Sequence, residues 1–236
     1  MYLLCASRLT SESIIKGSKL KFKSLELTHL ETFPKQMSRL ENIVHDFDCI
    51  LICSPSAIEM CKDLIPKISD TIFMVVGIGS YNSLSKLTKN SIIYPILNSG
   101  IDALFDECLA GVDLTGKKFL VIKAKEGRDD IAILLSKLGA TSETVPLYTH
   151  VKHSITAKQF KKYVLENKWD GVVITSYLFA STLIEHIEDN EAQAWFNQQR
   201  FIVMHENIAK LLHSVGANNV DIRHDTSSLI QFLEES

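Results

Sequence analysis

The sequence predicts an α/β fold of two Rossmann/flavodoxin-like domains, in which parallel sheets are flanked by helices and a two-stranded antiparallel β-ladder forms the hinge. Short apolar runs alternate with helical runs along the whole chain, which is typical of parallel sheets covered by helices. One strand–helix–strand pattern also occurs twice, at 47–84 and 169–212. In each copy an aromatic residue and an Asp precede an apolar core, and a Ser follows the Asp by six positions. Two copies indicate two related domains rather than a solenoid.

Strands are expected where branched and apolar residues form short runs bounded by turn residues. They lie at 2–6, 20–27, 48–53, 72–76, 91–94, 119–124, 144–151, 171–175, 201–204 and 220–223. The run at 20–27 alternates Lys with apolar residues, which indicates a half-exposed strand. The run at 144–151 lies between the two copies of the repeat, so we expect it to pass from one domain to the other.

Helices are expected between these strands, at 11–16, 35–45, 54–64, 80–87, 101–109, 131–138, 156–166, 179–187, 208–215 and 226–234. Ser54 is a typical helix N-cap, and Pro55 suits the first turn that follows it. Gly17 and Gly139 indicate helix ends. The stretch around Trp195 is interpreted as a polar insert.

The order of the units predicts that one domain is discontinuous. The first copy of the repeat is followed by a strand–helix–strand unit at 117–148, whereas the second copy ends with the chain. The unit that the second copy lacks is supplied by 2–27, which is also strand, helix and strand. The expected bounds are 1–30 plus 152–236 for domain 1, 35–146 for domain 2, and 28–34 and 147–151 for the inter-domain linker strands.

Composition and charge narrow the class of protein. With 236 residues, 46% of them hydrophobic, the chain is long enough for two domains with full cores. The formal charge is −3 and no basic stripe with interleaved aromatics is found, which argues against nucleic acid as the main partner. No apolar run approaches the roughly 20 residues that span a bilayer, and the apolar start lacks the length and basic lead of a signal peptide. We therefore expect a cytoplasmic protein without a membrane partner.

The five cysteines are expected to be reduced thiols, because their number is odd and no secretion signal is found. Cys49 and Cys53 have a spacing of four, which would suggest a metal pair on a helix. In a strand, however, residues four apart lie about 13 Å from each other along one face. We therefore expect these thiols to be packed in a core, and we expect no metal site.

Several short motifs, taken in their order along the chain, resemble those of a known protein family. They are the strand ends at 53–54 and 175–176, the Val-Gly-x-x-Ser-x-x-x-Leu turn at 76–84, and the block at 116–151. This block contains Gly-Arg, then Leu-Gly-Ala, then Val-Pro-Leu-Tyr. With this ordered set the chain resembles the uroporphyrinogen-III synthase family over essentially its whole length. The resemblance implies two α/β domains joined by a two-stranded β-ladder.

The resemblance also implies an activity, that of a cyclising hydro-lyase in tetrapyrrole (heme) biosynthesis. Such an enzyme removes the hydroxyl of linear hydroxymethylbilane as water and closes the macrocycle with ring D inverted through a spiro intermediate. The product is uroporphyrinogen III, and the family uses no metal and no organic cofactor. The implied partners are the small-molecule substrate, hydroxymethylbilane, and the preceding enzyme of the pathway, hydroxymethylbilane synthase. The protein is expected to be a monomer.

Tyr148 matches the family's tyrosine on the inter-domain strand, and the resemblance implies that it donates a proton to the departing hydroxyl. The alternative is a tyrosine that packs in the hinge and bonds locally through its hydroxyl. Since a phenol has a pKa near 10, its contribution can be orientation more than proton transfer. His29 and His150 lie on the two crossing strands and are expected to be surface histidines.

Four hydroxyl side chains are expected to bind the carboxylates of the substrate. Ser54, Ser56 and Ser176 lie at carboxyl ends of predicted parallel strands, where open α/β sheets bind ligands. The alternative for each is helix capping alone. Ser80 stands where the family usually has Thr, and this change keeps the hydroxyl.

Three cations and one amide complete the expected binding residues. Arg8 matches an arginine that follows the family's first strand, and Lys123 and Arg128 follow another strand. The alternative for Lys123 and Arg128 is a solvated basic loop. The turn at 205–208 departs from the family's Gly-Pro-x-Thr, because Ile208 occupies the Thr position and Gly and Pro are missing. Asn207 is the expected substitute.

Two other classes of protein fit part of the pattern. Two α/β lobes with a two-stranded hinge also describe small-molecule binding proteins that close on a ligand. A Gly-x-Gly turn at 77–79 resembles a dinucleotide-binding turn, but it lacks the third Gly and an acidic residue about 20 positions on. A titration with a substrate analogue, with and without nucleotide, discriminates between these classes.

Overall fold

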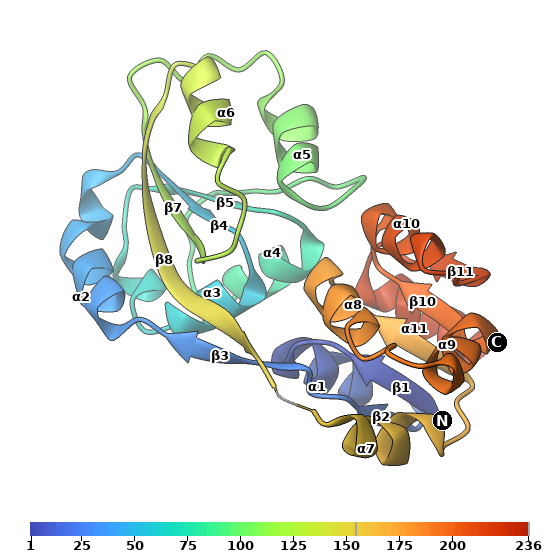
Figure 1. Ribbon diagram of the computed structural model, residues 1–236. Helices are drawn as coiled ribbons and strands as arrows, with labels where there is room; N and C mark the ends of the chain where they lie inside the picture. Colours follow the sequence, from blue (N-terminus) through green and yellow to red (C-terminus); the bar gives the residue numbers. More distant parts are fainter. Residues whose placement is uncertain (154, 236) are drawn as a thin grey trace. The chain divides into compact units, whose positions relative to one another are not determined.

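The computed structural model describes residues 1–153 and 155–235. The chain forms two compact units (Figure 1). Unit 1 comprises Met1–His29 and Val151–Ser236, and unit 2 comprises Leu30–His150. In the described residues, no helix is long and apolar enough to cross a membrane.

The sheet of unit 1 has the strand order β11-β10-β9-β1-β2, and every neighbouring pair is parallel. Its strands are β1 (Tyr2–Cys5), β2 (Phe22–Ser24), β9 (Gly171–Ile174), β10 (Arg200–Val203) and β11 (Asn219–Ile222). Its helices are α1 (Arg8–Gly17), α7 (Ala157–Phe160), α8 (Tyr177–Ile184), α9 (Asn190–Gln198), α10 (Glu206–Ser214) and α11 (Thr226–Glu235). A π-helical turn, Lys161–Leu165, continues α7.

Alternation along the strands sends side chains to both faces of this sheet, so two cores form. On one face, Val172 and Phe201 pack with residues of α7, α8, α9 and α10. On the other face, Val173 and Ile202 pack with Ile14 of α1 and with α11. Both faces are therefore covered, as parallel sheets require.

The sheet of unit 2 has the strand order β3-β8-β7-β4-β5-β6. Its strands are β3 (Thr28–Thr32), β4 (Cys49–Ile52), β5 (Ile72–Val75), β6 (Ile92–Ile93), β7 (Lys118–Ala124) and β8 (Thr141–Lys152). Its helices are α2 (Pro34–Ile43), α3 (Pro55–Met60), α4 (Ile78–Leu84), α5 (Ile101–Ala103), which continues as the π-helix Leu104–Leu109, and α6 (Ile131–Lys137). Short 3₁₀ turns lie at Val44–Asp46 and Ile65–Lys67.

The strands from β8 to β6 are parallel, and helices cover both faces of this sheet as well (Figure 1). Ile50 and Leu120 face the core under α2, α3 and α4. Leu51 and Val121 face the core under α5 and α6. The prediction of parallel sheets flanked by helices is therefore confirmed.

Strands β3 and β8 are neighbours, and each continues across the division between the units. Phe33 N–H donates to Leu147 O at 2.8 Å, and His153 N–H donates to Leu27 O at 2.9 Å. Residue numbers fall along one strand as they rise along the other, which is an antiparallel pattern.

Two sequence predictions about helices were wrong. The stretch around Trp195 is not an insert but the helix α9, which Asp189 caps by accepting a hydrogen bond from Ala192 N–H at 2.8 Å. Ala192 and Phe196, four positions apart, are its buried residues, and its many polar residues concealed this narrow stripe. The helix expected to reach residue 64 ends at Met60, because the chain tightens into turns after it.

Replacing Asp189 with Ala should lower the free energy of unfolding by about 1 kcal/mol, because the Ala192 N–H loses its capping partner. Asp189→Asn should keep the stability, since an amide oxygen can accept the same bond. Chemical denaturation followed by tryptophan fluorescence measures this, because Trp195 lies on the helix itself. An alanine variant as stable as the parent would contradict the assignment of the cap.

Candidate active site

Three neighbouring strands of unit 2 end at one edge of its sheet. Because β7, β4 and β5 are parallel and adjacent, the segments that follow them meet at their carboxyl ends. These segments are 53–56, 76–80 and 124–130. Open α/β sheets bind their ligands at this edge.

The Tyr148 hydroxyl lies 2.8 Å from Ser54 Oγ. Ser54 also accepts a hydrogen bond from Ala57 N–H at 3.0 Å and so caps α3, which confirms its predicted capping role. Burial raises the pKa of Tyr148, although hydrogen bonds with Ser54 and Ser56 act in the opposite direction. The phenol is therefore neutral at pH 7, and it sits among the hydroxyls of two serines.

A β-bulge aims Tyr148 into this position. Lys123 pairs with Pro146, but the next residue, Ala124, pairs with Tyr148, so Leu147 is the extra residue of the bulge. Strict alternation would place Leu147 and Tyr148 on opposite faces. Instead both are buried in the same core, with 1% and 2% of their surfaces exposed. Bulges commonly redirect a side chain in this way.

The Lys123 ammonium is directed into the loop that follows its own strand. It donates to Gly127 O, to Arg128 O at 2.9 Å and to Asp129 Oδ1 at 2.7 Å, and its side chain is only 7% exposed. An ammonium has three protons, so these bonds use all of them. Lys123 thus fixes the loop 124–130.

Arg128 is held between two carboxylates. Its Nε donates to Asp130 at 2.8 Å, its Nη2 donates to the other Asp130 oxygen, and its Nη1 donates to Asp102. These hydrogen bonds raise the pKa of Arg128 above its ordinary value. The cations of Lys123 and Arg128 are therefore both paired with acidic side chains.

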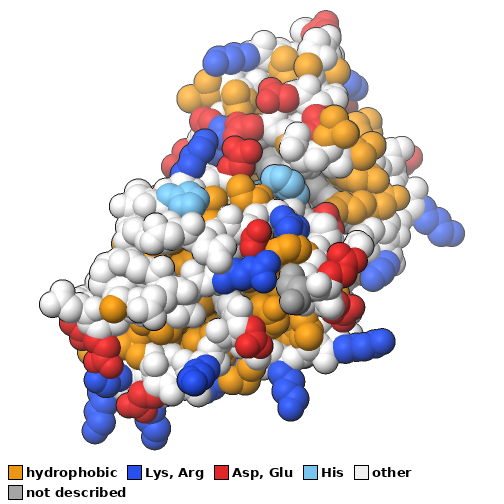
Figure 2. Space-filling model, turned by 90° about the vertical axis from the view of Figure 1, so that its right-hand side faces the viewer, with side chains coloured by type: hydrophobic (Ala, Val, Ile, Leu, Met, Phe, Trp, Pro, Cys, Tyr) orange, Lys and Arg blue, Asp and Glu red, His pale blue; other side chains and the backbone are white. Residues whose placement is uncertain are grey.

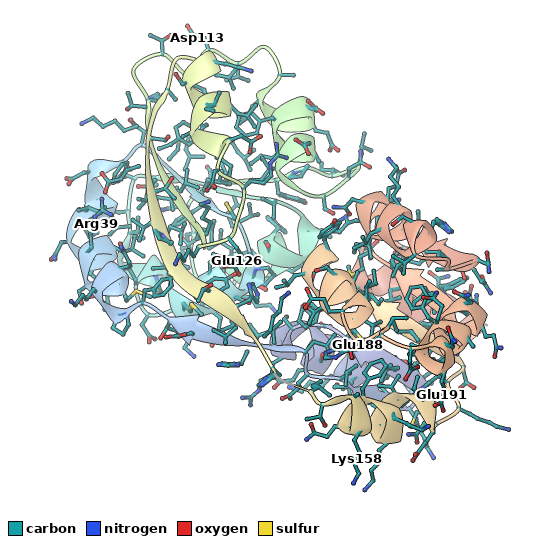
Figure 3. All side chains as sticks on the ribbon, viewed as in Figure 1. Arg39, Asp113, Glu126, Lys158, Glu188 and Glu191 are labelled. Carbon is teal, nitrogen blue, oxygen red and sulfur yellow. The ribbon has the colours of Figure 1, made fainter. Side chains whose placement is uncertain are left out.

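The same loop carries Glu126, which sequence reasoning did not single out (Figure 3). Its carboxylate accepts hydrogen bonds from His150 N–H at 2.9 Å, Thr149 Oγ1 at 3.0 Å, and His150 Nδ1. Burial raises the pKa of Glu126, but the hydrogen bonds from His150 and Thr149 lower it more, so the net pKa lies below the ordinary value. Its only signal in the sequence is its position after a strand end.

Ser80 lies in α4 and is buried, with 4% of its surface exposed. The preceding turn is packed closely, since a Cβ on Gly77 would lie 3.0 Å from Ser99 Cβ. The loop around Ser99 is held by Glu107, whose carboxylate accepts the N–H groups of Ile96 and Leu97 at 2.9 Å each. Ser80 is therefore a buried residue of the helix that follows this closely packed turn.

Three predicted residues lie at the corresponding edge of unit 1, because β1, β9 and β10 are adjacent and parallel. Arg8 begins the helix after β1 and its Nε donates to Glu12 at 3.0 Å, with 86% of its side chain exposed. Ser176 follows β9 and caps α8 through Phe179 N–H at 3.4 Å. Asn207 follows β10 and is exposed.

Ile208, at the family's Thr position, is fully buried in the core of unit 1. It therefore supports the fold, and the polar groups of this turn are His205, Glu206 and Asn207. On the face drawn in Figure 2, Lys and Arg side chains are scattered among acidic and apolar ones. That distribution fits local contacts with acidic groups better than a continuous basic stripe.

Cys49 and Cys53 pack in or against the core under α5 and α6. Burial raises the pKa of Cys49 to about 11 and that of Cys53 to about 12, so both are neutral thiols at pH 7. Among the described residues, no three or more His, Cys, Asp or Glu side chains are grouped so that they could hold a metal ion.

The model of the family described as uroporphyrinogen-III synthase HemD matches residues 16–231, which is most of the chain. The chain belongs to the uroporphyrinogen-III synthase family. No curated protein matches the sequence significantly. Membership of this family makes the protein a cyclising lyase of heme biosynthesis.

Two solved structures share the fold. Uroporphyrinogen-III synthetase from Helicobacter pylori is 12% identical, with 99% of this chain and 98% of that chain covered and a TM-score of 0.64. A mutant uroporphyrinogen III synthase from Thermus thermophilus is 13% identical, with 99% and 97% covered and a TM-score of 0.58. At these identities the likeness concerns the fold, and the family match carries the assignment of the chain.

Proposed function

We propose that this protein closes linear hydroxymethylbilane into uroporphyrinogen III, with loss of water and inversion of ring D. The observation that carries the proposal is the family match over residues 16–231. The hydroxyl cluster around Tyr148, at the carboxyl edge of a parallel sheet, supports it.

The reaction makes three demands on the protein. Hydroxide is a poor leaving group, so an acid or hydrogen-bond donor must act on the departing oxygen. The azafulvenium ion that remains is electron-poor and needs polar surroundings without a nucleophile. Ring D must also present its substituted carbon to the cation, which is mainly a matter of positioning. Hydroxyl groups such as those of Ser54 and Tyr148 suit the first two demands.

We assign Tyr148 the role of hydrogen-bond donor to the departing hydroxyl. Ser54 accepts from Ala57 N–H and can donate its own proton to the Tyr148 oxygen. In that arrangement the Tyr148 proton is left for the substrate. Its raised pKa keeps the phenol protonated, so the proton stays available as a donor.

Within each unit, polar groups at the carboxyl edge of the sheet are proposed to bind carboxylates of the substrate. Unit 1 would contribute Arg8, Ser176 and Asn207. Unit 2 would contribute Ser56, Ser80 and Arg128. Lys123 would act indirectly, since its ammonium is already bonded within the loop that carries Arg128.

We also propose that units 1 and 2 are the two domains of the fold, and that β3 and β8 are the two-stranded antiparallel hinge between them. The hydrogen bonds at 27–153 and 33–147 support this assignment, because they lie on either side of the division at residues 29–30 and 150–151.

A coupled assay tests the function. Hydroxymethylbilane is generated in situ, the protein is added, and the products are oxidised so that the uroporphyrin isomers can be separated. We expect mostly type III. A reaction without the protein is the control, since hydroxymethylbilane left alone closes to type I. Only type I in the presence of the folded protein would overturn the proposal.

A further inference from the structure

The proposed reaction needs a proton at its start and releases one at its end. The departing hydroxyl must be protonated to leave as water, and a carbon of ring D loses a proton after the new C–C bond forms. Tyr148 suits hydrogen bonding more than repeated proton transfer, because burial raises its pKa above the ordinary value of a phenol. A group that exchanges protons near neutral pH is therefore needed in addition.

His150 lies two residues after Tyr148 on β8. The two rings meet edge to face, with centroids 5.3 Å apart and planes at 75°. The His150 side chain is 19% exposed, so it is neither a free surface histidine nor a core residue. This placement differs from the surface histidine that the sequence suggested.

Glu126 fixes the orientation of His150. One carboxylate oxygen accepts both His150 N–H, at 2.9 Å, and His150 Nδ1. The second oxygen accepts Thr149 Oγ1 at 3.0 Å. Because Nδ1 faces the carboxylate, Nε2 is the ring nitrogen that remains for another partner. A carboxylate behind an imidazole is the arrangement that orients histidines which exchange protons.

The turn that carries Glu126 is itself held in place. Lys125 N–H donates to Tyr148 O at 2.7 Å, and Gly127 N–H donates to Ala124 O at 3.1 Å. A Cβ at Gly127 would lie 3.1 Å from Ala124 O and 3.2 Å from Lys123 Cδ, so the turn leaves little space there. Together with the Lys123 bonds, these contacts fix the carboxylate relative to β8.

We propose that His150 is the proton-transfer residue of the reaction and that Glu126 is its positioning residue. This inference rests on the proposed function. Protonated His150 gives its Nε2 proton to the hydroxyl oxygen, the C–O bond breaks, and water leaves with the bonding electrons. After ring closure, neutral Nε2 takes the proton from the ring D carbon. The proton given at the start is thereby recovered, and no oxidant, reductant or cofactor is required.

The charged and titratable groups around His150 come from three elements. Tyr148 lies on its own strand, and Glu126 lies on the turn after β7 beside the exposed Lys125. The neighbouring strand β3 carries Glu31 and His29, and the His29 ring packs against His153 with centroids 4.8 Å apart. Of these groups, Glu126 is the one with a hydrogen bond to the His150 ring.

Two variants test the proposal in the coupled assay. His150→Gln should lower kcat by about 10²-fold or more, because it removes a proton-transfer group. Glu126→Gln keeps a hydrogen-bond acceptor for the His150 ring but removes the carboxylate that orients it. In this variant kcat should fall about tenfold while KM stays unchanged, because the orientation of a reacting group acts on the chemical step. Loss of a residue with only a structural role would not lower kcat selectively.

Matched controls are His45→Gln and Glu143→Gln. His45 is exposed in the turn before β4. Glu143 lies on β8, pairs with Arg39, and has the same 39% side-chain exposure as Glu126. Both controls should behave as the parent protein.

A His150→Gln enzyme within about threefold of the parent, or a Glu126→Gln enzyme with the same kcat as Glu143→Gln, would overturn the proposal while the parent still makes type III. If the parent makes only type I, the proposed function fails, and this inference fails with it. Should His150→Gln not fold, as judged by circular dichroism, the kcat and KM of Glu126→Gln alone decide the question.

Discussion

Lys123→Met should lower the free energy of unfolding by about 1.5–3 kcal/mol, the range for hydrogen bonds that involve a charged group. Met fills a similar volume but donates nothing to Gly127 O, Arg128 O or Asp129. The loop 124–130 then loses its central attachment. That loop carries Glu126. We therefore also expect kcat to fall about tenfold or more, because displacing a residue that positions a reacting group slows the chemical step.

Lys125→Met is the matched control, since Lys125 is the exposed lysine of the same loop. It should change the free energy of unfolding by less than about 0.5 kcal/mol, as surface substitutions usually do. Unfolding should be followed by circular dichroism, because Trp169 and Trp195 both lie in unit 1 and report on that unit. Equal midpoints for the two variants would show that the bonds of Lys123 do not stabilise the loop.

Tyr148→Phe should lower kcat by about one to two orders of magnitude, because the departing hydroxyl loses its hydrogen-bond donor. The ring, its packing and the cap of α3 by Ser54 stay in place. The fold should therefore be affected only slightly, with a loss of about 1 kcal/mol for the missing bond to Ser54. Initial rates of type III formation measure the effect.

Tyr163→Phe provides the control for Tyr148→Phe. It deletes a hydroxyl that donates to Ser24 O at 3.0 Å in unit 1, so the chemical change is the same. Ser54→Ala combined with Tyr148→Phe should cost less than the sum of the single effects, because the two hydroxyls act as one hydrogen-bonded pair. A rate for Tyr148→Phe within about twofold of the parent would remove this hydroxyl from the mechanism.

The local pattern of the sequence was sufficient to predict most of the strands and helices. Branched apolar runs give the strands. Ser54 and Ser176 mark helix starts that the structure shows as N-caps, and Pro55 occupies the first helical position after Ser54. These signals depend on residues within one turn of each other, so they can be seen without the fold. Helix α9 is the exception, since only two buried residues, Ala192 and Phe196, mark its apolar stripe.

The arrangement of the candidate site could not be predicted in the same way, because it depends on contacts between residues far apart in the chain. No local signal indicates that Leu147 is the extra residue of a bulge, and the bulge decides where Tyr148 points. The same holds for the capture of Lys123 by the carbonyls of its loop and for the contact of Glu126 with His150. The sequence does not distinguish a solvated lysine or histidine from a hydrogen-bonded one, because tertiary packing determines which partners its side chain has.

By itself, therefore, the sequence determined the α/β class, the order of most elements and, through ordered short motifs, the family. Only the tertiary structure decided which polar side chains are free for a substrate and which are already bonded. The physical reason is that strand and helix patterns follow local geometry, whereas strand register and hydrogen bonds between distant residues form only when the sheets assemble.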